Sequence, residues 1–238
     1  MTAGAGYVTI FTMEIKSEYL EELADRALAE DIGAGDVTTQ ATVAPDLKGQ
    51  GLIVARAAGV ISGLDITALV FSRIDPEITF STKLSEGSVV AVGECIAEIS
   101  GRLTSVLVAE RTALNFLMHL SGIATLTSRF VKQIAGTGCK ILDTRKTTPT
   151  LRLLEKRAVK SGGGENHRLG LYDMILIKEN HISAAGSLTK AIEAALRVTT
   201  ESKSKNMLIE VEVTSLDDVR EAARFPIDRI MLDNFDLE

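Results

Sequence analysis

The chain has 238 residues, of which 45% are hydrophobic and 24% charged, and its formal net charge is −6 at pH 7. This composition excludes an extensively disordered chain, and the length is sufficient for one large domain or two smaller ones. The negative charge argues against a nucleic-acid-binding protein, because such proteins need a broad basic face that neutralises phosphates.

The amino-terminal segment, the lengths of the apolar stretches and the two cysteines together indicate a cellular location. The amino-terminal residues 1–12 have no positively charged start, and their apolar run is too short for a signal peptide. No stretch approaches the length of a membrane span. Cys95 and Cys139 lie far apart and not at a metal-ligand spacing. We therefore expect a reduced, cytoplasmic protein that is not bound to a membrane.

The first half of the chain predicts one helix followed by several short strands. Residues 16–30 have helical spacing, and the Gly33–Asp36 turn ends that helix. Another helix is expected at residues 64–72. Glycine-containing turns separate the expected strands, which are residues 51–57, 59–62, 77–83, 89–92 and 95–100.

The pattern changes near residue 105 to helices that alternate with strands. A long apolar helix is expected at residues 110–131. Strands are expected at residues 140–143, 174–177, 207–213 and 229–232, and helices at residues 149–160, 187–199 and 215–224. Alternation at this spacing predicts parallel strands joined by right-handed crossovers, hence an α/β fold.

Three cationic motifs lie close together between Ile141 and His181. They are Asp143–Thr147, Asn166–Arg168 and Ile177–His181, and they hold two arginines, two lysines and two histidines. Such a cluster in an acidic protein indicates an anionic small-molecule ligand. Phosphate and carboxylate are the anions that arginine binds through paired hydrogen bonds.

Each polar motif begins where a predicted strand ends. Lys178 follows one strand, Asp233 follows another, and Glu212 lies within the strand between them. In an α/β barrel these carboxyl ends converge on one mouth. Two carboxylates beside a bound anion indicate a divalent cation such as Mg²⁺. Glu210 shares the strand face of Glu212, so spacing leaves open which of the two reaches the mouth.

Several segments resemble quinolinate phosphoribosyltransferase, the family also called nicotinate-nucleotide pyrophosphorylase (carboxylating). They occur in the family's order and cover roughly residues 20–235. The segments that carry the resemblance are residues 31–39, 110–115, 119–125, 143–149, 162–173, 175–181, 210–213 and 232–235.

The resemblance implies a two-part fold and a reaction. Residues 1–108 would form an N-terminal α/β sandwich domain, and residues 109–238 an incomplete, TIM-like α/β barrel. The implied enzyme transfers phosphoribosyl from phosphoribosyl pyrophosphate to quinolinate with loss of carbon dioxide, in de novo NAD synthesis. It requires Mg²⁺, and it forms a head-to-tail homodimer with shared active sites.

The resemblance also assigns the substrate-binding residues. Arg145, His167 and Arg168 are expected to form a clamp for the two carboxylates of quinolinate. Arg111 of the second subunit would complete this clamp.

The catalytic residues follow from the same motifs. Lys146 and Lys178 would be the cations beside the substrate carboxylate and the phosphoribosyl group. Glu212 and Asp233 would be the carboxylates that contact the ribose and hold Mg²⁺.

Other conspicuous residues have a structural interpretation. His119, on an apolar helix face, is expected to be a satisfied packing histidine and not a catalyst, and His181 to fix the loop after Lys178. Gly162–Gly164 would let the backbone pass close to the ligand. The remaining candidates are Asp36 as a turn or helix cap, and Arg152 and Arg157 as surface charges.

Family members continue beyond Phe235 with strands and a turn that bind the ribose phosphate, whereas this sequence ends at Glu238. We therefore expect it to be a piece of a longer chain; a second polypeptide that supplies the remainder and an inactive relic are the alternatives. Two alternatives for the function also stay open. One is a related protein of molybdenum-transport operons, against which the Asn166–Arg168 and Ile177–His181 motifs argue. The other is a catalytically silent relative that binds dicarboxylates.

Overall fold

Contacts divide the chain between His167 and Arg168 into two units, residues 1–167 and residues 168–238. The computed structural model describes residues 15–201 and 207–236, so the amino-terminal segment at residues 1–12 lies outside the described part. The predicted boundary between residues 108 and 109 remains a prediction. One helix, α4 (Leu103–Gln133), is continuous through that position.

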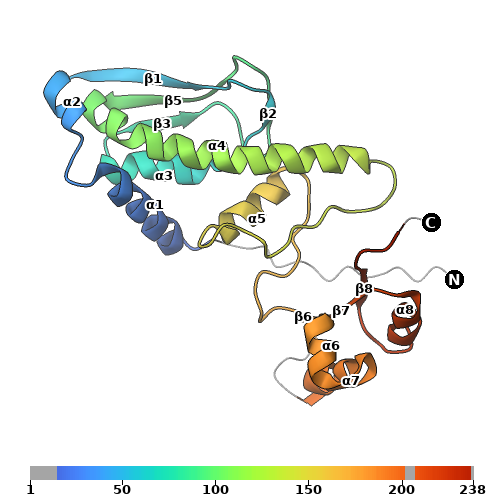
Figure 1. The fold of residues 1–238 in the computed structure, drawn as a ribbon. Helices are drawn as coiled ribbons and strands as arrows, with labels where there is room; N and C mark the ends of the chain where they lie inside the picture. Colours follow the sequence, from blue (N-terminus) through green and yellow to red (C-terminus); the bar gives the residue numbers. More distant parts are fainter. Residues whose placement is uncertain (1–14, 202–206, 237–238) are drawn as a thin grey trace. The chain divides into compact units, whose positions relative to one another are not determined.

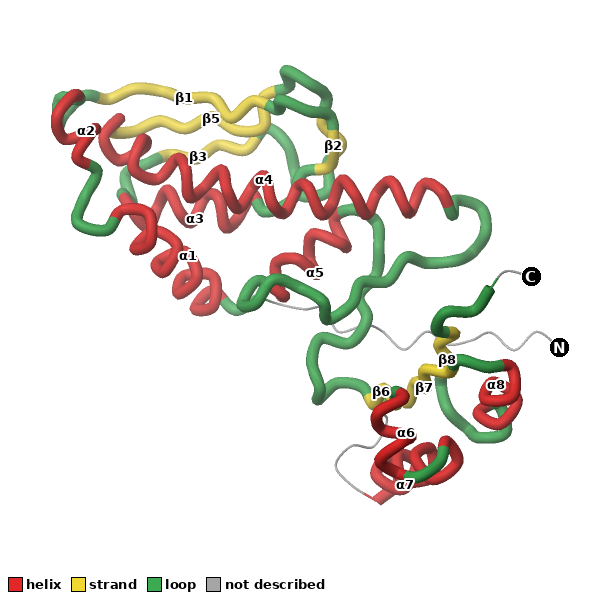
Figure 2. Tube along the Cα trace, in the orientation of Figure 1, coloured by secondary structure: helices red, strands yellow, loops and turns green. Residues whose placement is uncertain are grey.

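The first unit contains two small antiparallel sheets (Figures 1 and 2). In the larger sheet, β5 (Cys95–Arg102) lies between β1 (Lys48–Val54) and β3 (Thr79–Thr82). The smaller sheet pairs β2 (Gly59–Val60) with β4 (Val89–Val90). All five expected strands are therefore present, although most are shorter than the sequence predicted.

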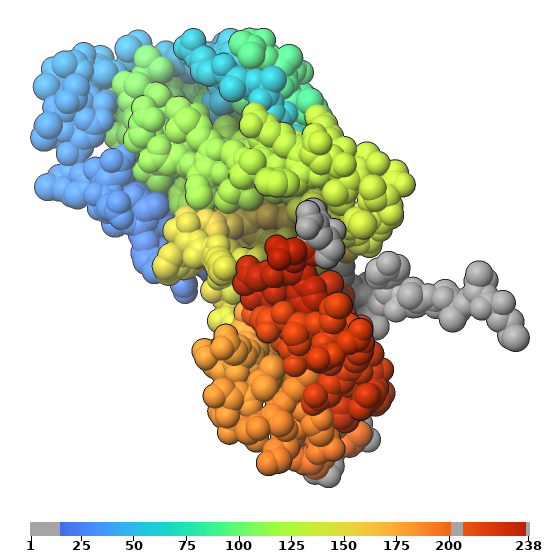
Figure 3. Space-filling view, turned by 45° about the vertical axis from the view of Figure 1, so that its right-hand side comes forward, coloured from blue at the N-terminus to red at the C-terminus, as the bar shows by residue number. Residues whose placement is uncertain are grey.

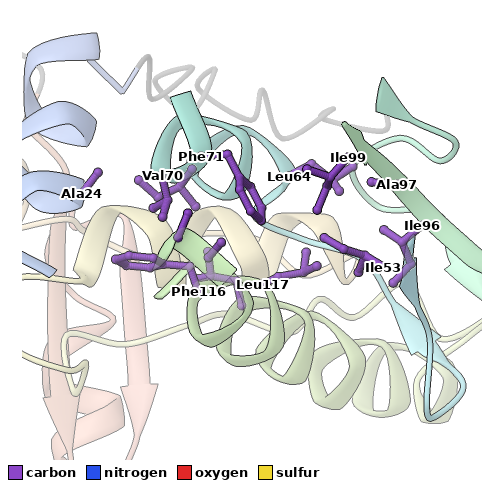
Figure 4. Packing of buried hydrophobic residues seen from close by; sticks show 14 of the residues in the cluster. Ala24, Ile53, Leu64, Val70, Phe71, Ile96, Ala97, Ile99, Phe116 and Leu117 are labelled. Carbon is purple, nitrogen blue, oxygen red and sulfur yellow. The ribbon is translucent and has the colours of Figure 1, made fainter. Parts of the chain in front are cut away.

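Helices cover one face of the larger sheet (Figure 1). They are α3 (Leu64–Ile74) and α4. The helix α1 (Ser17–Ile32) packs on α3 and α4, and α5 (Arg152–Ser161) packs against α4. Their apolar faces bury a core around Phe71, Val70 and Leu117 (Figure 4). Burial of these side chains stabilises the layered arrangement by about 1.5–3 kcal/mol for each large residue. The expected helices of this unit are confirmed.

Part of α4 also remains on the surface. Its side chains Met118, Leu126 and Phe130 are exposed, and the helix is visible in Figure 3 as green to yellow-green atoms. The helix is therefore amphipathic rather than buried all round.

A short helix that the sequence did not predict, α2 (Val37–Thr42), follows the first glycine turn. Asp36 caps it, because its Oδ1 accepts a hydrogen bond of 2.9 Å from the backbone nitrogen of Thr39. Hydrogen bonds from the Thr39 side chain and backbone lower the pKa of the Asp36 carboxyl. The expected capping role of Asp36 is confirmed.

The second unit is built on a parallel sheet in the order β6 (Ile175–Ile177), β7 (Ile209–Val213), β8 (Arg229–Leu232). Between these strands run α6 (Glu179–Ala185), α7 (Leu188–Glu201) and α8 (Leu216–Ala222). Ile177, Val211 and Ile192 belong to the core that joins strands and helices. The predicted α/β alternation with parallel strands is confirmed.

Two local predictions for the second half are wrong or incomplete. The strand expected at residues 140–143 is reduced to a single parallel bridge between Leu142 and Glu165. Only Glu165 pairs there, because the side chain of Asn166 binds Asp143 and the residues before Glu165 form a turn. The helix α6 was not predicted.

Within the described residues, none of the helices combines the length and apolar character that crossing a membrane requires.

Candidate active site

The strand register of the second unit places Lys178 beside Glu212. Ile177 pairs with Val211, so the next residue on each strand, Lys178 and Glu212, lies on the opposite face of the sheet. Lys178 Nζ is 2.5 Å from Glu212 Oε2. Lys178 is about half exposed and Glu212 is mostly buried, so this pair can exchange its interaction for one with a ligand.

A neighbouring carboxylate, Glu210, precedes Glu212 on β7 and lies on the same face of the strand. Its side chain is buried, and its Oε2 is 3.7 Å from Nη1 of Arg229, which begins β8. Glu212 is the carboxylate nearer the carboxyl end of the sheet and the one that contacts Lys178. Contact with Lys178 thus favours Glu212 over Glu210 as the carboxylate of the candidate site.

Asp233 follows β8 directly. Its backbone nitrogen donates to the carbonyl of Val213 at 2.9 Å, which continues the strand pairing by one residue. Met231 pairs with Glu212, and Asp233 shares the face of Met231 by the period of two. Lys178, Glu212 and Asp233 therefore line one face at the carboxyl ends of three adjacent strands.

His181 holds the start of α6. Its Nδ1 accepts a hydrogen bond of 2.9 Å from the backbone nitrogen of Lys178. The imidazole thus fixes the turn that carries Lys178. The expected role of His181 is confirmed.

The loop that carries Arg145 in the first unit is held by α5. Arg152 Nε donates to Thr147 Oγ1 at 3.0 Å, and Arg152 Nη2 donates to the carbonyl of Arg145 at 3.4 Å. The prediction that Arg152 is a surface charge is wrong, because the guanidinium braces this loop. The Nε atom of Arg145 is buried and has no hydrogen-bond partner among the described residues.

Two further contacts hold the same loop. Glu155, which is buried, accepts from the backbone nitrogen of Thr148 at 3.1 Å and lies 2.8 Å from His119 Nε2. Burial alone would raise the pKa of the Glu155 carboxyl, but the hydrogen bonds from Thr148 and His119 outweigh it and lower the pKa. The prediction for His119 is confirmed in part. Its imidazole is satisfied by the hydrogen bond to Glu155, but its side chain is half-exposed and does not pack on the apolar face.

The remaining predicted site residues are Arg111, Lys146, His167 and Arg168. Arg111 is exposed on α4, and its side chain forms no hydrogen bond or ion pair within residues 15–201 and 207–236. Lys146 is exposed in the braced loop. His167 ends the first unit, and Arg168 begins the second, where its Nη1 donates to the carbonyl of Met174 at 3.4 Å.

This arrangement can be compared with known proteins. Residues 36–121 match the N-terminal domain of quinolinate phosphoribosyl transferase, and residues 123–238 match its C-terminal domain. The chain belongs to the quinolinate phosphoribosyltransferase family. The Lys178–Glu212–Asp233 row and the braced Arg145 loop both lie within the matched C-terminal region.

Curated relatives support this membership. The chain is 46% identical over 207 residues to a probable nicotinate-nucleotide pyrophosphorylase (carboxylating) of Synechocystis, covering 87% of this chain and 68% of that one. It is 41% identical over 222 residues to the chloroplastic nicotinate-nucleotide pyrophosphorylase (carboxylating) of Arabidopsis thaliana, covering 90% and 63%. The chain thus spans about two thirds of the length of these relatives.

Solved structures agree with the fold. NadC from Streptococcus pyogenes superimposes with a TM-score of 0.88 at 41% identity, covering 95% of this chain and 79% of that chain. The nicotinate-nucleotide pyrophosphorylase of Francisella tularensis gives a TM-score of 0.86 at 40% identity, with 94% and 77% covered.

The glycine run of this family member serves packing. A Cβ atom on Gly162 would lie 2.3 Å from the carbonyl oxygen of Ala124, and one on Gly164 would lie 2.9 Å from Thr127 Cγ2. Both contacts are with α4. These contacts show that the backbone at Gly162 and Gly164 packs closely against α4. The expected approach to a ligand stays a prediction.

The sequence did not indicate two residues that support the candidate site, Glu155 and Lys156, and its assignment of Arg157 needs correction. Glu155 and Lys156 lie on the helix α5, where two adjacent charged residues are normally expected to face solvent. Both are buried. Arg157 on the same helix is no free surface charge, because its Nη2 donates to Asp65 Oδ1 at 2.6 Å.

Proposed function

We propose that this protein transfers phosphoribosyl from phosphoribosyl pyrophosphate to quinolinate, and releases pyrophosphate and carbon dioxide to give nicotinate mononucleotide. The observation that carries the proposal is the row of Lys178, Glu212 and Asp233 at the carboxyl ends of β6–β8. It combines one cation with two carboxylates, as transfer from an anionic sugar donor requires. The names of the relatives support the same reaction.

The substrate clamp is the second part of the proposal. Arg145, His167 and Arg168 would bind the two carboxylates of quinolinate, because arginine forms paired hydrogen bonds with a carboxylate. The buried Nε of Arg145, which has no hydrogen-bond partner in residues 15–201 and 207–236, supports this assignment. A donor that is already removed from water loses little further solvation when it binds an anion.

The chemistry follows from charge placement. Departure of pyrophosphate leaves an oxocarbenium-like ribose, which the carboxylate of Glu212 would stabilise while the quinolinate nitrogen bonds to the ribose carbon. Lys178 and Lys146 would offset the charge of the leaving group and of the substrate carboxylate. The bond between C2 and its carboxylate then breaks, and carbon dioxide leaves. The electron pair stays on C2, where the positive charge of the adjacent pyridinium nitrogen stabilises it until a proton from solvent bonds to that carbon. Orientation by the clamp supplies the remaining acceleration.

Glu212 and Asp233 would also hold Mg²⁺. Two carboxylates on adjacent strands fit this ion, which typically takes one or two carboxylates and completes its shell with water and substrate phosphates. Within the described residues, no group of three or more histidine, cysteine, aspartate or glutamate side chains forms a complete metal site. The protein would therefore hold the ion together with substrate oxygens, and the ion would neutralise the pyrophosphate charge.

Turnover by the purified 238-residue chain tests the proposed function. With quinolinate, phosphoribosyl pyrophosphate and Mg²⁺, we expect nicotinate mononucleotide by chromatography, and we expect its formation to stop when EDTA removes the metal and to resume when Mg²⁺ is restored. Binding of quinolinate without product would instead favour a catalytically silent dicarboxylate-binding relative. Product that is unaffected by EDTA would contradict the role of Mg²⁺.

A homodimer with shared active sites is part of the same proposal. The side chain of Arg111 on α4 is exposed and unpaired within the described part of the chain, which supports a contribution to the clamp of a second subunit. Inactive Arg111→Ala and Lys178→Ala chains should regain up to about a quarter of wild-type activity when mixed, because one site of a hybrid dimer has both residues intact. Absence of rescue, when subunit exchange is demonstrated with tagged chains, would contradict a shared site.

We also propose a cytoplasmic location. Cys95 and Cys139 are both free thiols in the structure, which supports a reducing compartment. Fractionation of the source cells, with detection of the native protein in the soluble fraction, would test this location.

A further inference from the structure

A buried ion pair in the first unit holds the backbone of His167. The ammonium group of Lys156 contacts Asp143 Oδ1 and donates to the carbonyl oxygen of His167 at 3.0 Å. Asp143 Oδ1 also accepts from the backbone nitrogen of His167 at 2.8 Å. Both backbone polar groups of His167 are therefore bound by the two side chains of one ion pair.

The same pair also holds the residue before His167. Asn166 Nδ2 donates to Asp143 Oδ2 at 2.5 Å and to the carbonyl of Lys156 at 2.8 Å. Asp143 stands two residues before Arg145 in the chain. One ion pair thus joins the two segments that carry Arg145 and His167.

The degree of burial indicates a role other than stability. The side chain of Lys156 is 1% exposed and that of Asp143 is 7% exposed. Removing two charges from water is so costly that apolar residues of similar volume generally stabilise a fold equally well. A fixed charge pair is better suited to holding polar backbone groups in one geometry, since an apolar pair offers His167 no hydrogen bonds.

We propose that Lys156, through its pair with Asp143, is a positioning residue that presets His167 and the Arg145 loop to receive the dicarboxylate substrate. This inference rests on the proposed function. Lys156 itself does not contact the substrate. It acts by fixing the atoms that do, as supporting hydrogen bonds do in other preorganised sites.

Three variants test this role. Lys156→Met removes the donor to His167. The double variant Asp143→Leu/Lys156→Met removes both charges together, so that the fold is retained without an orphaned buried charge. Arg157→Met, on the neighbouring residue of α5, breaks the pair with Asp65 and serves as a control for general loss of stability.

We expect Lys156→Met and the double variant to raise the KM for quinolinate by roughly 10- to 100-fold, because small misplacements of binding groups have effects of this order. The KM for phosphoribosyl pyrophosphate should stay within about threefold. Arg157→Met should lower the melting temperature without changing the ratio of the two KM values. Equal increases of both KM values in the double variant, or wild-type KM values in it, would overturn the proposal.

Hydrogen exchange without substrates separates this inference from the proposed function. Peptides that contain His167 and Arg168 should exchange faster in Lys156→Met and in the double variant than in the wild type, and Arg157→Met should not alter them. Unchanged exchange in the double variant would refute positioning, whatever the enzyme catalyses. Absence of turnover in the wild type, with the exchange difference present, would refute only the proposed function.

Discussion

Replacing Arg145 with alanine should raise the Kd for quinolinate by about 10- to 200-fold, which corresponds to the roughly 1.5–3 kcal/mol of hydrogen bonds to a charged group. The Kd for phosphoribosyl pyrophosphate should change by less than about threefold, because the proposed contacts of Arg145 are with the dicarboxylate alone. The Nε of Arg145 is buried and has no hydrogen-bond partner in the part of the chain that the structure describes, so its removal leaves no acceptor there unsatisfied. Isothermal titration with each substrate measures both constants.

Arg157→Ala is the matched control for this prediction. Arg157 also has a buried Nε without a hydrogen-bond partner among the described residues, but its outer nitrogens pair with Asp65. Its loss should leave quinolinate binding unchanged. Equal losses of affinity for both substrates in Arg145→Ala would contradict the clamp.

Replacing Lys178 with alanine should lower kcat by about 10²- to 10³-fold, the usual effect of removing one preorganised group that stabilises developing charge. The lysine lies 2.5 Å from Glu212 and remains about half exposed, so its charge is available to a bound anion. Steady-state kinetics with both substrates measure the loss. Lys190→Ala, an exposed lysine on α7, is the control and should retain wild-type kcat.

A double variant distinguishes catalysis from simple pairing. If Lys178 served only to neutralise Glu212, then Lys178→Met/Glu212→Gln should recover activity, because no charge is left unpaired. We expect no recovery, because both groups are proposed to act on the substrates. A double variant more active than Lys178→Met alone by tenfold or more would indicate a mainly structural pair.

Local sequence patterns were sufficient for most elements of the fold. The helix at α1 and the strand Arg229–Leu232 lie close to where period and turn residues predicted them. These signals depend on neighbouring residues alone. The strand expected at residues 140–143 did not form, because a strand needs a partner segment that pairs over several residues. Among the described residues, only Glu165 pairs with this segment.

The candidate site was predictable to a similar degree. The motifs named Lys178, Glu212 and Asp233, and the structure places them on one face of a parallel sheet. Sequence could not choose between Glu210 and Glu212, because both have the same parity along the strand. They are distinguished only by their contacts in the folded sheet, where Glu210 lies near Arg229 and Glu212 pairs with Lys178.

The sequence by itself determined the family and the α/β class, because the motifs and the hydrophobic period depend on the order of residues alone. It also predicted the residues proposed to bind an anionic substrate. The tertiary structure alone decided which charges are buried and what they hold. Lys156 lies on a polar helix, so its sequence context predicts a solvent-exposed charge. In the structure it is buried with Asp143 and donates to the carbonyl oxygen of His167. Burial and pairing depend on segments distant in sequence, and a local pattern carries no information about which of them will meet.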